Sequence, residues 1–101
     1  MQTIALHVLS KQSNLAIIQM EGRKFPGSVI QGDSLAILCA EAKEISERLS
    51  QIGCTDEELL CLAQEHQQKL LGRLLHYQQI LSDHGIPLPC KAAKPSNLVV
   101  L

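Results

Sequence analysis

The first third of the chain alternates between apolar and polar residues. In the stretch 3–9, Ile4, Leu6 and Val8 fall on one face. A period of two predicts a half-buried strand. Two more apolar runs follow, one after a polar turn at 11–14 and one after a polar break at 21–24. The predicted strands span residues 3–9, 15–20 and 28–31, and their short connections favour an antiparallel sheet.

At Gly32 and Asp33 the apolar period changes to about three and a half. Six apolar residues then recur three or four positions apart, as on one face of a helix. They are Leu35, Leu38, Ala42, Ile45, Leu49 and Ile52. We expect Asp33 or Ser34 to cap this helix by accepting a bond from a free backbone N–H. Gly53 suits the position after its last turn, so the predicted helix spans 34–52.

A second helix is predicted over residues 56–84. It opens on Thr55-Asp-Glu-Glu58, the sequence of a capping box, in which the Thr55 side chain accepts from the N–H of Glu58. Gly85 is the expected stop. The apolar stripe of this helix consists of Leu60, Ala63, Gln67, Leu70, Leu74, Tyr77 and Leu81.

These elements predict an α+β fold in the order β-β-β-α-α, with a sheet of three or four antiparallel strands. The chain has 101 residues, which suits one domain with one modest core, and we place that domain at residues 1–85. Residues 86–101 contain three prolines and are expected to form an extended tail. The apolar run at 98–101 is a candidate for a fourth strand at the sheet edge.

The lengths of the two helices predict an uncovered apolar surface. At ~1.5 Å per residue the second helix extends about 15 Å beyond the first when the two pack antiparallel. The candidate interaction residues on that helix are Leu70, Leu74, Tyr77 and Leu81. A second copy of the chain would cover them in a helical dimer, so a homo-oligomer is expected. The alternative is a monomer in which both helices pack onto the sheet.

Composition narrows the function classes. Aromatic residues make up 2% of the chain and the formal net charge is −1. Base stacking and phosphate neutralisation therefore both lack the residues they need, and this chain alone is not expected to bind nucleic acid. No apolar run approaches the ~18 residues of a membrane span, and no signal-peptide pattern opens the chain. A cytoplasmic protein without membrane contact is expected.

The residues with reactive side chains form no recognisable constellation. There are four cysteines, Cys39, Cys54, Cys61 and Cys90, and no Cys-x-x-Cys pair. Free thiols are expected, with no metal site and no cofactor. Ser34 has no nearby histidine in sequence and no Gly-x-Ser-x-Gly elbow around it. We therefore predict no catalytic residues and no enzymatic activity.

The joint between the predicted sheet and the first helix carries a family resemblance. Residues 25–35 read Phe-Pro-Gly-Ser-Val-Ile-Gln-Gly-Asp-Ser-Leu, and 40–45 read Ala-Glu-Ala-Lys-Glu-Ile. This resembles the HicB-like antitoxin pattern over residues 2–50, and also looks like a small uncharacterised bacterial family with the same signature. The motif positions are Pro26, Gly27, Gly32, Asp33 and Ser34. The HicB resemblance implies a sheet with a helix on one face that covers a toxin ribonuclease, although no DNA-binding module follows in this chain.

Three functions are compatible with these patterns. We favour a non-enzymatic protein-interaction module that oligomerises through its helices. The first alternative is an antitoxin or immunity-type inhibitor of a nuclease, with a toxin-like protein as partner. The second is a small-ligand or enzymatic site beside the Pro-Gly loop, in which Asp33 would take part.

Overall fold

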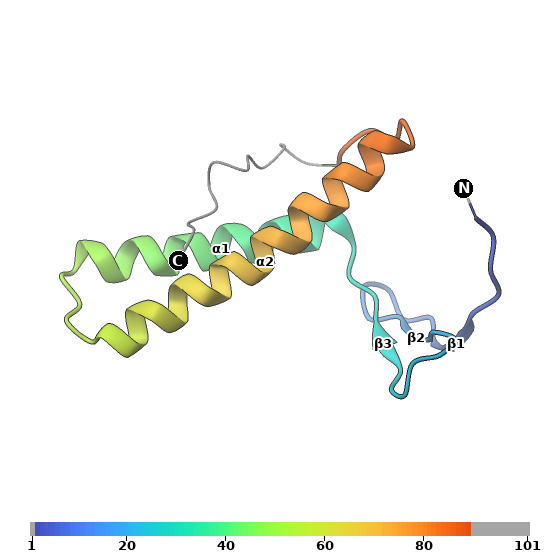
Figure 1. Cartoon of the computed structure of the whole chain (residues 1–101), viewed down its shortest axis with the longest axis horizontal. Coiled ribbons are helices and arrows are strands. Elements are labelled where there is room, and N and C mark those ends of the chain that lie inside the picture. The colour runs from blue at the N-terminus through green and yellow to red at the C-terminus, as the bar shows by residue number, and fades with distance from the viewer. Residues whose placement is uncertain (1, 90–101) are drawn as a thin grey trace. The chain divides into compact units, whose positions relative to one another are not determined.

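A computed structural model of the chain describes residues 2–89 and confirms the α+β fold. Three strands are followed by two helices (Figure 1). The chain divides into two compact units, residues 1–31 with the strands and residues 32–101 with the helices. The predicted strand at 98–101 and most of the predicted tail lie outside the described residues.

The sheet unit contains one antiparallel sheet in the order β1-β2-β3. The strands are β1 (His7–Ser10), β2 (Ile17–Gln19) and β3 (Gly27–Ser28). Each is shorter than predicted, because the apolar alternation extends beyond the residues that pair. A register shift between Val8 and Ser10 interrupts the ladder of β1, and beyond β3 the pairing adds a bond from Val29 N–H to the Ala16 carbonyl, 2.9 Å.

The turns of the sheet unit differ in part from prediction. The polar turn after β1 is confirmed, with Asn14 in the left-handed region at φ 61°. The chain next reverses at Gly22, whose φ is 78°, and Arg23 N–H donates to the Met20 carbonyl at 3.2 Å. This turn lies within the polar break predicted at 21–24, and Pro26 and Gly27 are not part of it. Gly27 is the first residue of β3 and pairs with Ile18, and Pro26 leads into that strand because its fixed φ suits extended backbone.

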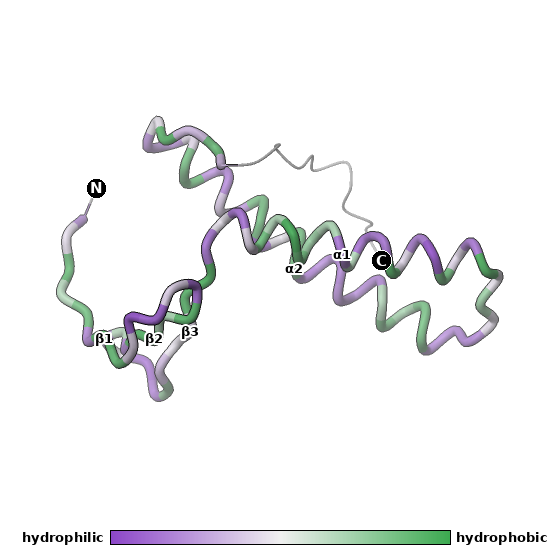
Figure 2. The backbone as a smooth tube through the Cα atoms, turned by 180° about the vertical axis from the view of Figure 1, so that it is seen from behind, coloured by the Kyte–Doolittle hydropathy of each residue, from purple (hydrophilic) through white to green (hydrophobic). Residues whose placement is uncertain are grey.

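The helical unit consists of α1 (Gly32–Gln51) and α2 (Glu57–Asp83). The two helices lie side by side and run in opposite directions (Figure 1). Their ends fall within two residues of the predicted ones. Gly53 and Gly85 follow the helices with φ of 69° and 66°, as expected for glycines that end a helix. In Figure 2, hydrophobic and hydrophilic segments alternate along both helices.

The predicted helix caps need correction. Asp56, not Thr55, caps α2, and its carboxylate accepts from the Leu59 N–H at 3.1 Å. Neither Asp33 nor Ser34 precedes α1, because the helix already begins at Gly32. Asp33 instead lies in the first turn, where its carboxylate accepts from the Ser34 N–H at 2.8 Å. A carboxylate there still suits the positive end of the helix dipole.

The buried core lies between the two helices. It consists of Leu35, Cys39, Ala42, Leu71 and Leu74. The predicted stripe of α1 is therefore only partly right, since Leu35 and Ala42 are buried while Leu38 and Ile45 are exposed. Cys39, four positions after Leu35, takes the inward position that we expected for Leu38. Leu38 and Ile45 lie about 60° around the helix from Leu35 and Ala42, and α2 covers only the edge of the stripe that carries Leu35 and Ala42.

Candidate interaction surface

Three large aliphatic side chains stand exposed in a line along α1. Leu38, Ile45 and Ile52 are 42%, 55% and 77% exposed. They are seven positions apart, so each lies about 20° around the helix from the last. Ile52 follows the last residue of α1, and its N–H donates to the Arg48 carbonyl at 3.0 Å, which continues the helical turn. We call these three residues the α1 row.

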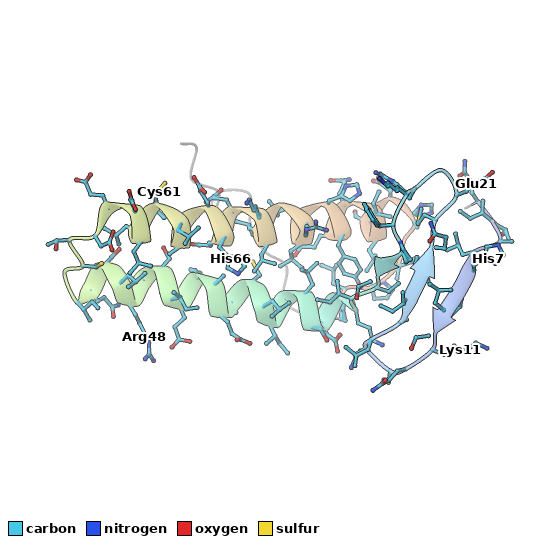
Figure 3. The ribbon with its side chains drawn as sticks, turned by 90° about the horizontal axis from the view of Figure 1, so that it is seen from below. His7, Lys11, Glu21, Arg48, Cys61 and His66 are labelled. Carbon is cyan, nitrogen blue, oxygen red and sulfur yellow. The ribbon has the colours of Figure 1, made fainter. Side chains whose placement is uncertain are left out.

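Charged residues flank the α1 row on one side. A shallow surface hollow around Ile45 is lined by Glu41, Glu44 and Arg48. The Arg48 guanidinium forms an ion pair with the Glu44 carboxylate at 2.7 Å, one helical turn away. Among the described residues, Glu41 has no ionic or hydrogen-bonding partner. Arg48 points away from α2 in Figure 3, so its charge is available on the outer surface of the helix pair.

The sequence pattern does not reveal the α1 row as a surface, because it predicts that these three residues belong to the buried stripe of the helix. Its residues belong to the same seven-residue repeat as Leu35, Ala42 and Leu49. The sequence does contain a signal for this arrangement. Cys39 lies four positions after Leu35 and three before Ala42, so these three residues form an inward-facing stripe that does not include Leu38. The charged residues Glu41 and Arg48 on the opposite edge also mark the outer limit of the row.

The predicted interaction residues on α2 lie largely inside the helix pair. Leu74 is 3% exposed and belongs to the core cluster. Leu70 and Tyr77 pack against that cluster, and Leu81 is half-buried. The expected overhang is too long, because α1 begins at Gly32, next to Tyr77. The part of α2 beyond Tyr77 is only six residues, or about 9 Å.

The Tyr77 ring lies against Gly32. A Cβ atom on Gly32 would overlap the far end of the Tyr77 ring. Gly32 has no left-handed φ, so the space taken by the ring, and not the backbone conformation, favours glycine here. The motif glycine of the joint therefore serves the packing of the two helices.

The other motif positions have local structural roles. Pro26 and Gly27 belong to the sheet unit, at the entrance to β3. Asp33 and Ser34 form the first turn of α1 and are joined by the hydrogen bond already described. A ligand or catalytic role for Asp33 beside the Pro-Gly loop stays a prediction.

The sheet unit has a second apolar surface. None of residues 2–31 is buried. Val8 pairs with Ile18, which pairs with Gly27, so these three lie on one face of the sheet. Nine large hydrophobic residues of the unit are exposed: Ile4, Leu6, Val8, Leu9, Leu15, Met20, Phe25, Val29 and Ile30. The sheet unit therefore exposes apolar side chains from its strands and from the segments around them.

Two of the thiols, those of Cys39 and Cys61, are in environments that keep them protonated. Burial raises the pKa of Cys39, and the charge of Lys43 opposes this in part. Cys61 is exposed, and its thiol donates to the Glu65 carboxylate, with Sγ 3.5 Å from Oε1, which raises its pKa. Activated cysteines have lowered pKa values, so neither thiol is in the environment of a nucleophile.

Two further observations concern residues 2–89. No three or more side chains of His, Cys, Asp or Glu come together there in a group able to hold a metal ion. No helix in that part of the chain combines the length and the apolar character needed to cross a membrane.

Comparison with known proteins identifies a family but no activity. A family model described as a family of unknown function (DUF6959) matches residues 1–90. No curated protein matches the chain, and neither does any solved structure. The resemblance to an uncharacterised family is thus supported, and no HicB assignment accompanies it.

Proposed function

The chain belongs to this family of unknown function, so its role must be inferred from its own surfaces, and we propose a non-catalytic protein-interaction module that self-associates through its helices. The observation that carries the proposal is the α1 row. The inward face of α1 already packs on α2, and the row is a second apolar line on the same helix. Exposed apolar surfaces of this kind mark protein–protein contacts.

The size of the row suits a modest association. Full burial of a Leu or Ile side chain contributes roughly 1.5–3 kcal/mol, and these three are about half exposed. A symmetric contact between two rows would bury six such side chains and contribute on the order of 5–10 kcal/mol. The cost of association is about 4–15 kcal/mol. We therefore expect a dimer that dissociates on dilution, not an obligate complex.

Sedimentation equilibrium of the full chain tests this proposal directly. Between low and high micromolar concentrations, the mean mass should rise from the 11.1 kDa of one chain toward twice that value. A mass that stays at one chain up to about 500 µM would contradict self-association, because that concentration detects Kd values near 1 mM. Circular dichroism of the same samples verifies that the helices are formed.

An antitoxin-type inhibitor is the second candidate, and the exposed apolar face of the sheet unit favours it. In HicB-like proteins the corresponding domain covers a toxin ribonuclease, and the order β1-β2-β3-α1 matches that arrangement. Co-expression with the product of any small neighbouring gene tests the idea. A stable complex that is lost on Val8→Asp but not on Ile45→Glu would support it. Failure of the two proteins to co-purify would contradict it.

A further inference from the structure

The charged residues beside the α1 row restrict which partner surface can bind it, because that surface must carry complementary charges. Glu41 precedes Ile45 by four positions and Arg48 follows it by three. At 100° per residue both lie about 40–60° from Ile45, on the same side of the row. The other side of the row carries Ala42 and Leu49, on the edge that packs toward α2; Ala42 is buried. The surface is therefore an apolar line with both signs of charge along one edge.

We propose that this surface docks on the same surface of a second copy, with the two α1 helices antiparallel across a twofold axis at Ile45. The inference rests on the proposed self-association and adds its geometry. Leu38 lies seven positions before Ile45 and Ile52 seven after it. A twofold axis through Ile45 thus sets Leu38 opposite Ile52 of the second copy, and Ile45 opposite its own counterpart. Isologous contacts of this kind pair each surface with itself.

The charges decide between antiparallel and parallel docking. A twofold axis perpendicular to the helices keeps both charged edges on one side of the contact. Glu41 then lies within one residue of Arg48 of the second copy, and the reverse pair forms as well. A parallel arrangement would put the two charged edges on opposite sides, where no such pair forms. The Glu41 carboxylate has no ionic partner within residues 2–89, and of the two arrangements the antiparallel one gives it a cation.

The same geometry places the second helices. The edge of α1 that packs toward α2 lies on the side away from Glu41 and Arg48. In the antiparallel dimer both copies of α2 therefore lie on one side of the contact, which gives a four-helix arrangement. The ion pair of Arg48 with Glu44 is compatible with this arrangement, because a guanidinium has five N–H donors and can serve two carboxylates.

Substitution at the axis is the first test. Ile45→Glu places two like charges opposite each other and should raise the Kd of the dimer at least about 100-fold. Ala40→Glu is the matched control, since Ala40 is exposed and lies about 140° around the helix from Ile45. The control should change Kd by less than about twofold. Both positions are exposed, so circular dichroism should show an unchanged helix content.

Charge reversal tests the register. Glu41→Arg alone and Arg48→Glu alone should each weaken the dimer about 5–50-fold at low salt, because each sets like charges together. The double variant Glu41→Arg/Arg48→Glu should return to within about threefold of the natural chain. A dimer that fails to recover in the double variant would overturn the proposed register.

Disulfide formation tests the twofold axis by a separate measurement. Ile45→Cys places two thiols at the axis, where they can reach disulfide geometry. Mild oxidation should give a covalent dimer through residue 45, identified by mass spectrometry of the linked peptides. Leu38→Cys should not link to itself, because its two copies lie fourteen positions, or about 21 Å, apart. Crosslinking at 38 but not at 45 would overturn the axis.

These outcomes separate the two proposals. A natural chain that stays monomeric overturns both. A natural chain that dimerises, but whose dimer tolerates Ile45→Glu, supports self-association and overturns the α1 contact. If the α1 row binds a different protein and no dimer forms, the proposal that a second copy of the chain covers the row is wrong.

Discussion

The ring of Tyr77 occupies the space beside Gly32 that a Cβ atom would fill. This contact joins the first residue of α1 to the sixth turn of α2, so it closes the end of the helix pair remote from the connecting loop. Tyr77 also packs against the core cluster of Leu35, Cys39, Leu71 and Leu74. The absence of a side chain at Gly32 therefore lets the ring complete the core.

We expect Gly32→Ala to lower the free energy of unfolding by about 1–3 kcal/mol, as overpacking does in other proteins. The added Cβ would push the ring away from the core cluster. Gly72→Ala is the matched control, because a Cβ there meets nothing within 4 Å. That change should stabilise the protein by up to about 1 kcal/mol through helix propensity. Urea unfolding at one fixed protein concentration measures both.

The partner of this contact provides a second check. In the background of Tyr77→Leu, Gly32→Ala should cost much less than it does alone, because the smaller side chain leaves room for the Cβ. If Gly32→Ala lowers the free energy of unfolding equally in both backgrounds, the effect comes from the backbone at Gly32 and not from the contact with the ring.

The helices were the most predictable part of the fold, because their signals are local. A period of three and a half identified both helices, and Gly53 and Gly85 marked their ends through a backbone conformation that glycine adopts easily. The caps were less predictable. Thr55 and Asp56 are adjacent and both suit a cap, and local sequence does not decide which of them takes the extended conformation.

The face of α1 that stays exposed could not be predicted from the sequence alone. Leu38 and Cys39 are neighbours, and either can continue an apolar stripe from Leu35. The position of α2 makes the choice, and it buries Cys39. The surface that we propose for association depends on this choice, so it required the tertiary structure. The predicted strands are too long for a similar reason. Apolar alternation shows which residues suit a strand, but it does not show how many of them pair with a neighbouring strand.

Removal of the cap of α2 should be measurable. Asp56→Ala removes the carboxylate that accepts from the Leu59 N–H and should cost about 1 kcal/mol. Thr55→Ala is the matched control and should cost less than about 0.5 kcal/mol, as for an exposed position without a structural contact. Thermal unfolding monitored by circular dichroism compares the two. A larger loss at Thr55 would favour the capping box that the sequence suggests.

The core of the helix pair is small, so single truncations should have large effects. Leu74 is 3% exposed, and Leu74→Ala should cost about 2–5 kcal/mol through lost burial and the cavity left behind. Leu62 is on the same helix and 63% exposed, so Leu62→Ala should stay within about 0.5 kcal/mol. Urea denaturation measures both changes. Similar losses at the two positions would contradict the packing described here.

The hydrogen bond between Cys61 and Glu65 should slow the reactions of this thiol. The carboxylate raises the pKa of Cys61, so at a given pH below that pKa less thiolate is present. Glu65→Gln removes the negative charge and should therefore lower the pKa and speed alkylation by iodoacetamide. Mass spectrometry of the peptides gives the rate at Cys61 across a pH series, and the rate at Cys54 in the same sample is the internal control. The two proteins should converge at high pH, where Cys61 is ionised in both. An unchanged rate near neutral pH would show that Glu65 does not hold the proton on the thiol.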